Sequence, residues 1–219
     1  MAQVKKPAVR EAILGAAYQL FRDQGYNGTT LSQIAAEAEI STANLYSYFS
    51  SKFDILYSIY DPWLRDRFKR LELELAAIRN PRKQLRHLVA VIWRDIPAEE
   101  NGFANNIIQA VSGASSEEEY DPSLLRMAEE FISRMLREML PPDRLKVVDV
   151  RSMSHVILMA FDGFAMNVHV NRDASCGDDE IEMLCTLILG NGLRSTVIER
   201  KEKPPKVRQK AKRTALLSE

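Results

Sequence analysis

The sequence predicts an all-α fold, and three observations support that prediction. Apolar residues recur at spacings of three and four along most of the chain, and no stretch shows the alternation typical of a strand. Residues that cap helices stand directly before several of these apolar stripes. The chain has 219 residues, of which 46% are hydrophobic, so it is large enough and apolar enough to bury a core.

The first apolar stripe predicts a helix that ends near Gly25. Its members fall on one helical face: Val9, Ile13, Ala16, Ala17, Leu20 and Phe21. A second helix of about two turns follows, because Thr30 and Gln33 have the spacing of a reciprocal capping box. Its apolar face consists of Leu31, Ile34, Ala35 and Ala38.

A third short helix is predicted from Thr42 to Tyr48, after a three-residue turn. Ser41 is placed to cap it, and Ile40 and Leu45 have the spacing of a hydrophobic staple. Two short helices joined by a tight turn and preceded by a longer helix have the dimensions of a helix-turn-helix. The sequence therefore predicts a DNA-binding unit near its N-terminus.

The later helices are predicted from the same signals. Ser51 caps a fourth helix, and Asp61-Pro62 is expected to bend or restart it, with a domain junction between Pro62 and Arg79. Asn80-Pro81 opens a helix to about Ile96, and Asp121-Pro122 opens another to about Leu140. Two further helices are expected over residues 143–171 and 178–200, both apolar around much of their circumference. The expected division is a DNA-binding domain over residues 7–60, a helical domain over 61–200 and a basic, disordered tail over 201–219.

Composition excludes several other classes. No segment approaches the roughly 18 apolar residues of a membrane span, and the polar N-terminus does not resemble a signal peptide, so a cytoplasmic protein is expected. Cys176 and Cys185 are too few for a disulfide framework or a zinc site, so no metal and no cofactor are expected. The formal net charge is zero, but Lys5, Lys6 and Arg10 form a small basic arm.

The third helix carries the residue types that recognise DNA. Leu45 and Phe49 share one face and are expected to anchor it, which leaves small or hydrogen-bonding residues on the other faces. Asn44 suits the edge of adenine, because a side-chain amide donates and accepts at once, whereas tyrosine hydroxyls and Lys52 suit phosphate oxygens. Taken alone, Tyr46 and Tyr48 are better explained as core aromatics of a helical bundle.

Residues 9–56 together resemble the tetracycline-repressor (TetR) family. The matching residues are Leu20-Phe21, Gly25-Tyr26, Thr29-Thr30-Leu31, Ile34-Ala35, Ala38, Ser41, Leu45-Tyr46-Ser47-Tyr48-Phe49 and Ser51-Lys52. The resemblance implies a homodimeric DNA-binding regulator whose C-terminal helices bind a small effector and whose last two long helices form the dimer. It also implies the following DNA-facing set: Thr30, Ser41, Thr42, Ala43, Asn44, Tyr46, Ser47, Tyr48 and Lys52.

Glu39 departs from the family pattern, which has glycine at this turn position. A residue with a side chain costs about 1 to 2 kcal/mol in the left-handed conformation. The turn is therefore either strained or different in geometry. Glu37 and Glu39 also place negative charge near the expected phosphate surface.

The C-terminal region contains methionine and aromatic residues suited to an adaptable apolar pocket. The candidate ligand-binding residues are Trp93, Phe103, Met127, Phe131, Phe161 and Asp162. Asp162 interrupts an apolar run, and a buried carboxylate needs a partner, which is the ligand, water or the other subunit. His155 and Asp162 share a helix face, a pattern more typical of a satisfied core pair than of an acid–base pair.

These features predict a regulator rather than an enzyme, because no nucleophile elbow, phosphate-binding glycine loop or zinc-helix motif is present. The expected function is a ligand-responsive repressor that binds a pseudo-palindromic double-stranded operator as a homodimer and responds to an unknown small-molecule effector. Two alternatives stay open: a helical dimerisation module and a small helical enzyme, neither with sequence-specific DNA binding.

Overall fold

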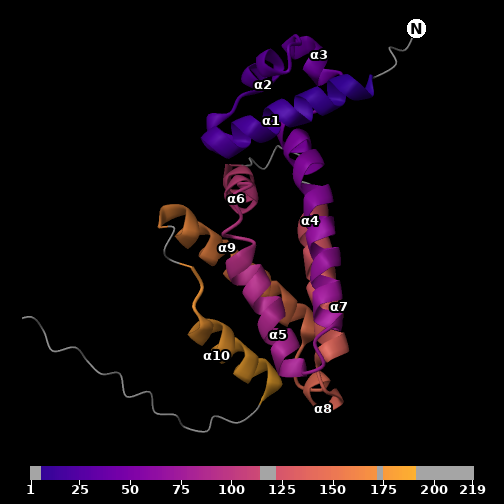
Figure 1. The fold of residues 1–219 in the computed structure, drawn as a ribbon, viewed down its shortest axis with the longest axis vertical. Helices are drawn as coiled ribbons and strands as arrows, with labels where there is room; N and C mark the ends of the chain where they lie inside the picture. Colours follow the sequence, from indigo (N-terminus) through magenta and orange to yellow (C-terminus); the bar gives the residue numbers. More distant parts are fainter. Residues whose placement is uncertain (1–5, 114–121, 172–174, 191–219) are drawn as a thin grey trace, which may run out of the picture.

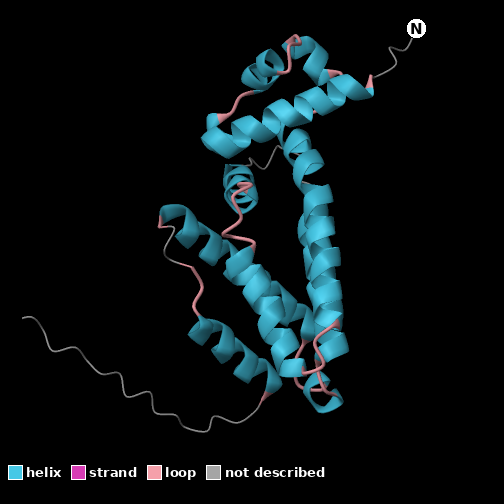
Figure 2. Ribbon diagram, in the orientation of Figure 1, coloured by secondary structure: helices cyan, strands magenta, loops and turns pink. Residues whose placement is uncertain are grey.

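The computed structural model describes residues 6–113, 122–171 and 175–190, which form helices and turns and contain no strand (Figures 1 and 2). The predicted all-α class is confirmed. Lys5, Asp121, Leu193 and the basic tail from Lys201 to Glu219 lie outside the described residues. No helix in the described ranges is both long and apolar enough to cross a membrane.

Three helices form one end of the molecule, and a long fourth helix leads away from them (Figure 1). These are α1 (Pro7–Gly28), α2 (Leu31–Glu37), α3 (Thr42–Tyr46) and α4 (Lys52–Ala76). The remaining elements are α5 (Pro81–Ala90), the π-helical turn η1 (Val91–Asp95), α6 (Phe103–Gly113), α7 (Ser123–Met139), α8 (Pro142–Leu145), α9 (Val150–Val170) and α10 (Asp178–Leu189). Helices α5, α6 and α7 contact α4, α9 packs against α6, η1 and α7, and α10 packs against α5.

Local capping starts the helices where the sequence predicts. The Thr30 side chain accepts from the Gln33 amide and the Gln33 side chain accepts from the Thr30 amide, so the predicted capping box at α2 is confirmed. Side chains also accept hydrogen bonds from backbone amides at the starts of α3, α4 and α5, where the capping residues are Ser41, Ser51 and Asn80. Each cap satisfies an amide that the helix cannot pair internally.

Pro62 does not restart the fourth helix, so the prediction of a new helix start there is wrong. Helix α4 runs from Lys52 to Ala76 with Pro62 inside it. Tyr60 and Leu64 are buried on either side of the proline, and their packing stabilises the helix against the loss of one backbone hydrogen bond. The boundary expected at residues 60 and 61 therefore falls inside one continuous helix.

Two more helix predictions need correction. The stretch 143–171 forms two helices, α8 and α9, and Asp149 caps the second by accepting from the Arg151 amide. The helix expected over 178–200 ends at Leu189, because Gly190 adopts the left-handed conformation with a φ of 63°. The Arg144 guanidinium of α8 donates to the carbonyls of Ile188 and Leu187 over 2.9 and 3.2 Å, which satisfies the end of α10.

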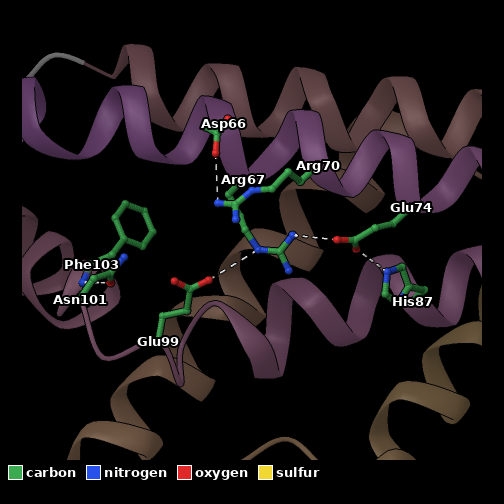
Figure 3. A network of polar contacts seen from close by, with 8 residues as sticks. All are labelled: Asp66, Arg67, Arg70, Glu74, His87, Glu99, Asn101 and Phe103. Atoms are coloured by element: carbon green, nitrogen blue, oxygen red, sulfur yellow. Dashed lines mark hydrogen bonds and ion pairs between the residues drawn. The ribbon is translucent and has the colours of Figure 1, made fainter.

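A polar network holds α5 and the segment before α6 against α4 (Figure 3). Arg67 of α4 forms ion pairs with Glu74 at 3.8 Å and with Glu99 at 3.5 Å. Glu74 also pairs with His87 of α5 over 2.7 Å. Two residues after Glu99, the Asn101 side chain accepts from the Phe103 amide at the first residue of α6. The start of α6 is thus positioned by the middle of α4.

Candidate DNA interface and ligand cavity

The turn between α2 and α3 uses the left-handed conformation. Glu39 has a φ of 55° and is the one non-glycine residue with positive φ in the described ranges. The Ile40 amide donates to the Ala35 carbonyl over 2.9 Å and the Glu39 amide to the Ala36 carbonyl over 3.1 Å, which closes the turn. Of the two alternatives left open by the sequence, the strained turn is the one found.

Leu45 and Phe49 anchor the third helix, as expected. Both are buried, whereas their neighbours along α3 are exposed or partly exposed. The guanidinium of Arg10 in α1 lies 5.3 Å from the centre of the Phe49 ring and holds the two helices together. A helix buried along one narrow stripe leaves most of its circumference for another molecule.

The DNA-facing candidates gather around α3 and the start of α2. Five are exposed and four are partly exposed; the exposed ones are Thr30, Ser41, Ala43, Tyr46 and Ser47, and the others are Thr42, Asn44, Tyr48 and Lys52. Tyr46 is 55% exposed, so the alternative that it is a core aromatic is wrong. Tyr48 packs against the core, and its hydroxyl accepts from the Lys6 amide over 3.1 Å.

Lys52 has partners within the protein. Its ammonium donates to the carbonyls of Tyr26 and Thr29 over 2.7 and 2.8 Å and lies 4.0 Å from the centre of the Tyr26 ring. The side chain therefore joins the start of α4 to the end of α1. This structural role was not predicted from the sequence.

Asn44 keeps hydrogen-bonding capacity toward solvent. Its backbone amide donates to the Ser41 hydroxyl, and its Oδ1 accepts from the Ser47 hydroxyl over 3.3 Å. Its Nδ2 donates to none of the described residues, which suits a group that reads a base edge. The packing of Leu45 beside it fixes the backbone that carries this amide.

An apolar cavity of about 380 Å³ lies between α4, η1, α6, α7 and α9, within the usual size range of ligand pockets. Its walls are formed by Tyr57, Leu64, Phe68, Ile92, Ile96, Phe103, Ile107, Ile108, Val111, Ser112, Leu124, Leu125, Ala128, Ile132, Leu158, Met159, Phe161, Asp162 and Met166. Three of the six ligand candidates, Phe103, Phe161 and Asp162, are brought together here.

The other three candidates contribute to packing around the cavity. The Trp93 indole donates to the Ile157 carbonyl over 2.8 Å and its ring lies 5.0 Å from that of Phe164. Phe131 stacks on Phe68 with ring centres 4.3 Å apart, and Met127 is half-buried against the core. None of the three is among the residues that line the cavity.

Asp162 is the one charged residue in the described lining of this cavity. Burial raises the pKa of its carboxyl above the ordinary value of 3.8. The pairing with His155 considered from the sequence is not formed, because His155 contacts Glu129 instead, over 2.7 Å. Within the described ranges no group hydrogen-bonds the Asp162 carboxylate.

Helix α6 was missed in the sequence, although Phe103, Ile107 and Ala110 have helical spacing. One side of it lines the cavity through Ile107, Ile108, Val111 and Ser112. Its other side contacts α1, where the Asn27 amide donates to Gln109 Oε1 over 2.9 Å. Gly25, with a φ of 73°, lets α1 approach here, since a Cβ at this position would lie 2.9 Å from the same oxygen.

The fold and these two sites define a class: a helix-turn-helix protein whose N-terminal unit is joined by one continuous helix to a helical unit with an apolar cavity. Residues 13–59 match the family described as bacterial regulatory proteins, tetR family. The match covers α2, α3 and parts of α1 and α4, so the helix-turn-helix unit is assigned to this family.

Relatives and solved structures agree with this assignment. The chain is 38% identical over 80 residues to the HTH-type transcriptional regulator HbdR of Aromatoleum, covering 36% of this chain and 35% of that protein. It resembles a putative TetR-family regulator from Syntrophomonas wolfei, with a TM-score of 0.62, 22% identity, and coverage of 85% of this chain and 97% of the other. It also resembles FadR of Bacillus subtilis in complex with stearoyl-CoA, with a TM-score of 0.57, 17% identity, and coverage of 82% and 97%.

The sequence matches to curated relatives are confined to part of the chain. They span 35%, 32% and 49% of the length of the first relatives, HbdR, BepR and RutR. These relatives are named as transcriptional regulators, the class that the sequence predicts for this chain.

Proposed function

We propose that this protein is a transcriptional repressor that binds a pseudo-palindromic operator as a homodimer and is released by a small molecule. The observation that carries the proposal is the exposure of α3, which is anchored through Leu45 while Ala43, Tyr46 and Ser47 remain exposed. Small residues allow close approach to a DNA groove, and a hydroxyl such as that of Tyr46 suits phosphate oxygens. The proposed DNA contacts are Thr30, Ser41, Thr42, Ala43, Asn44, Tyr46, Ser47 and Tyr48, with Lys52 supporting the fold beneath them.

Effector control is proposed to act through α6. This helix forms part of the cavity wall and also contacts α1, so a ligand that displaces Ile107 or Ile108 also moves Gln109 against the end of α1. Ligand binding and DNA binding are then coupled, and the coupling is reciprocal: operator DNA weakens ligand binding by the same factor. The proposed effector contacts include Phe103, Phe161 and Asp162.

A second copy of the chain is proposed to pack on α9 and α10. Exposed residues on α9 follow the spacing of a helix–helix seam: Val156, Met159, Gly163, Met166 and Val170. Met183 and Leu187 add an exposed apolar strip on α10, and such patches mark interfaces. Leu184 and Ile188 of α10 do not belong to this surface, because both are buried within the subunit.

The test is to select DNA fragments from the source genome with the purified protein, and to repeat the selection with Tyr46→Ala. We expect the wild type to enrich a symmetric sequence whose half-sites lie about one DNA turn, or roughly 34 to 36 Å, apart. Tyr46→Ala should enrich it much less while it melts at the wild-type temperature, because Tyr46 is exposed. A wild type that enriches no common sequence would contradict the proposal.

The acyl-CoA ligand named for the Bacillus subtilis structure suggests one class of candidate effector. An acyl chain suits the aliphatic and aromatic walls of the cavity. The carboxylate of Asp162 disfavours an anionic head group in this cavity, so the charge of the ligands that bind tests the acyl-CoA candidate.

A further inference from the structure

The cavity combines an apolar wall with a single ionisable group. Asp162 of α9 stands among aliphatic and aromatic side chains, and the described lining contains neither Lys, Arg nor His. A carboxylate in such surroundings loses hydration without gaining a partner, which is unfavourable for the folded protein. An uncompensated charge of this kind is typical of a site completed by its ligand.

Three basic residues on helices that line the cavity are engaged elsewhere. Arg134 of α7 donates to Glu72 over 2.6 Å, and Arg67 of α4 pairs with Glu74 and Glu99. His155, two turns before Asp162 on the same helix, contacts Glu129. The segment 114–121, which connects two lining helices in the sequence, contains four acidic residues and no Lys or Arg. These groups do not neutralise Asp162.

We infer that the effector of this cavity is a hydrophobic amine whose protonated head group pairs with Asp162 and whose apolar body fills the space between α4, α6 and α7. The inference rests on the proposed function, since it names the ligand class of the same cavity. Aromatic walls suit such a ligand: the rings of Phe103 and Phe161 lie 6.4 Å apart in the lining, and ring faces attract cations. The volume of about 380 Å³ fits a compound of one ring and a short chain.

The test uses three probes with the same body and different head groups: 4-phenylbutylamine, 4-phenylbutanol and 4-phenylbutanoate. Each is titrated calorimetrically into the full chain without DNA at pH 7, for the wild type, Asp162→Asn and Asp143→Asn. Asp143 is an exposed carboxylate of α8 outside the cavity, so its variant controls for the change in net charge. Melting curves establish that each variant is folded.

We expect the wild type and Asp143→Asn to bind the amine about 10- to 100-fold more tightly than the alcohol, and the butanoate most weakly. Asp162→Asn should bind amine and alcohol about equally and should bind the butanoate more tightly than the wild type does. Equal affinities of the wild type for amine and alcohol would overturn the inference, as would unchanged selectivity in Asp162→Asn or the absence of saturable amine binding.

A different partner for Asp162 gives its own result. If a group of a second subunit or of the tail neutralises Asp162, Asp162→Asn lowers the melting temperature of the ligand-free protein. The wild type then does not prefer the amine to the alcohol. This pair of results also overturns the inference. The titration contains no DNA, so its failure leaves operator selection unaffected. Conversely, a protein that enriches no operator still gives an interpretable titration, which separates this inference from the proposed function.

Discussion

Asn106 of α6 donates a hydrogen bond from its Nδ2 to the carbonyl of Phe21 in α1, over 3.1 Å. The same Nδ2 donates to the Tyr60 hydroxyl of α4 over 3.0 Å, and all three residues are buried. A single amide thus joins the cavity wall to the helix-turn-helix unit and to the helix that connects the two. Its Oδ1 has no hydrogen-bond partner among the described residues, so Asn106 contributes to this junction only as a hydrogen-bond donor.

Replacing Asn106 by Ala should lower the free energy of unfolding by about 1 to 3 kcal/mol, because the Phe21 carbonyl and the Tyr60 hydroxyl lose a buried donor. Asn105→Ala, one residue earlier and partly exposed, serves as the control and should change it by less than about 1 kcal/mol. Urea denaturation measures both. Equal losses of unfolding free energy in the two variants would mean that the buried hydrogen bonds of Asn106 add no more stability than the partly exposed Asn105 does.

Glu39→Gly should stabilise the protein, because glycine adopts positive φ without the steric cost that Glu39 bears. We expect a gain of about 0.5 to 1 kcal/mol and tighter operator binding, since a negative charge near phosphate is removed. Glu37→Gln removes a nearby charge without changing the turn, so it should tighten DNA binding alone. A Glu39→Gly protein that melts below the wild type would contradict the strain argument.

Asn44→Ala should relax specificity at one position of each half-site by about 1 to 3 kcal/mol, because Asn44 is proposed to read a base. Tyr46→Ala should instead weaken binding to all sequences alike, as expected of a phosphate contact. Competition binding with operators mutated one base pair at a time distinguishes the two patterns. A uniform loss for Asn44→Ala would remove it from the set of base-reading residues.

Asp162→Asn should raise the melting temperature of the ligand-free protein at pH 7. Because burial raises the pKa of Asp162 in the folded state above 3.8, the folded protein holds this proton more tightly than the unfolded chain does. Stability therefore falls as the pH rises from about 3.8 through the folded pKa, and the penalty persists at neutral pH. The advantage of the variant should shrink as the pH falls below about 4; an advantage of constant size from pH 3 to pH 7 would point to another cause.

Leu187→Asp should yield monomers that retain their helical fold and lose operator affinity. Leu187 is 59% exposed on α10, so a carboxylate there disturbs a second subunit rather than the core. Val147→Asp changes an apolar residue that is 74% exposed and lies outside the proposed α9 and α10 surface, so this variant should remain dimeric. Analytical ultracentrifugation and operator titration measure both properties. A wild type that is monomeric at micromolar concentration would rule out this interface.

The helix starts could be predicted from the sequence because capping is local. Thr30, Ser41 and Asn80 each bond an amide three residues ahead, so four residues contain the whole signal. The uninterrupted α4 could not be predicted, since the packing of Tyr60 and Leu64 that outweighs Pro62 involves residues distant in sequence. For the same reason, the hydrogen bond from Lys52 to the end of α1 could not be predicted.

The cavity was predicted in part. Asp162 stood out because a charge within an apolar run is a local signal. Trp93 and Phe131 have the same residue character as Phe103 and Phe161, and only the way the helices cross decides which side chains line the space. Sequence therefore indicated that a pocket exists but not which aromatic residues form it.

The fit of Gly25 against Gln109 constrains how hybrid regulators are assembled from this protein. A DNA-binding unit exchanged from a relative brings its own residue to position 25, and any side chain there meets the Gln109 amide of the recipient. Because α4 is continuous, there is also no flexible linker at which to cut between the two units. A working hybrid must therefore exchange the contact surface of α6 together with α1. Operator choice and effector response are then transferred together.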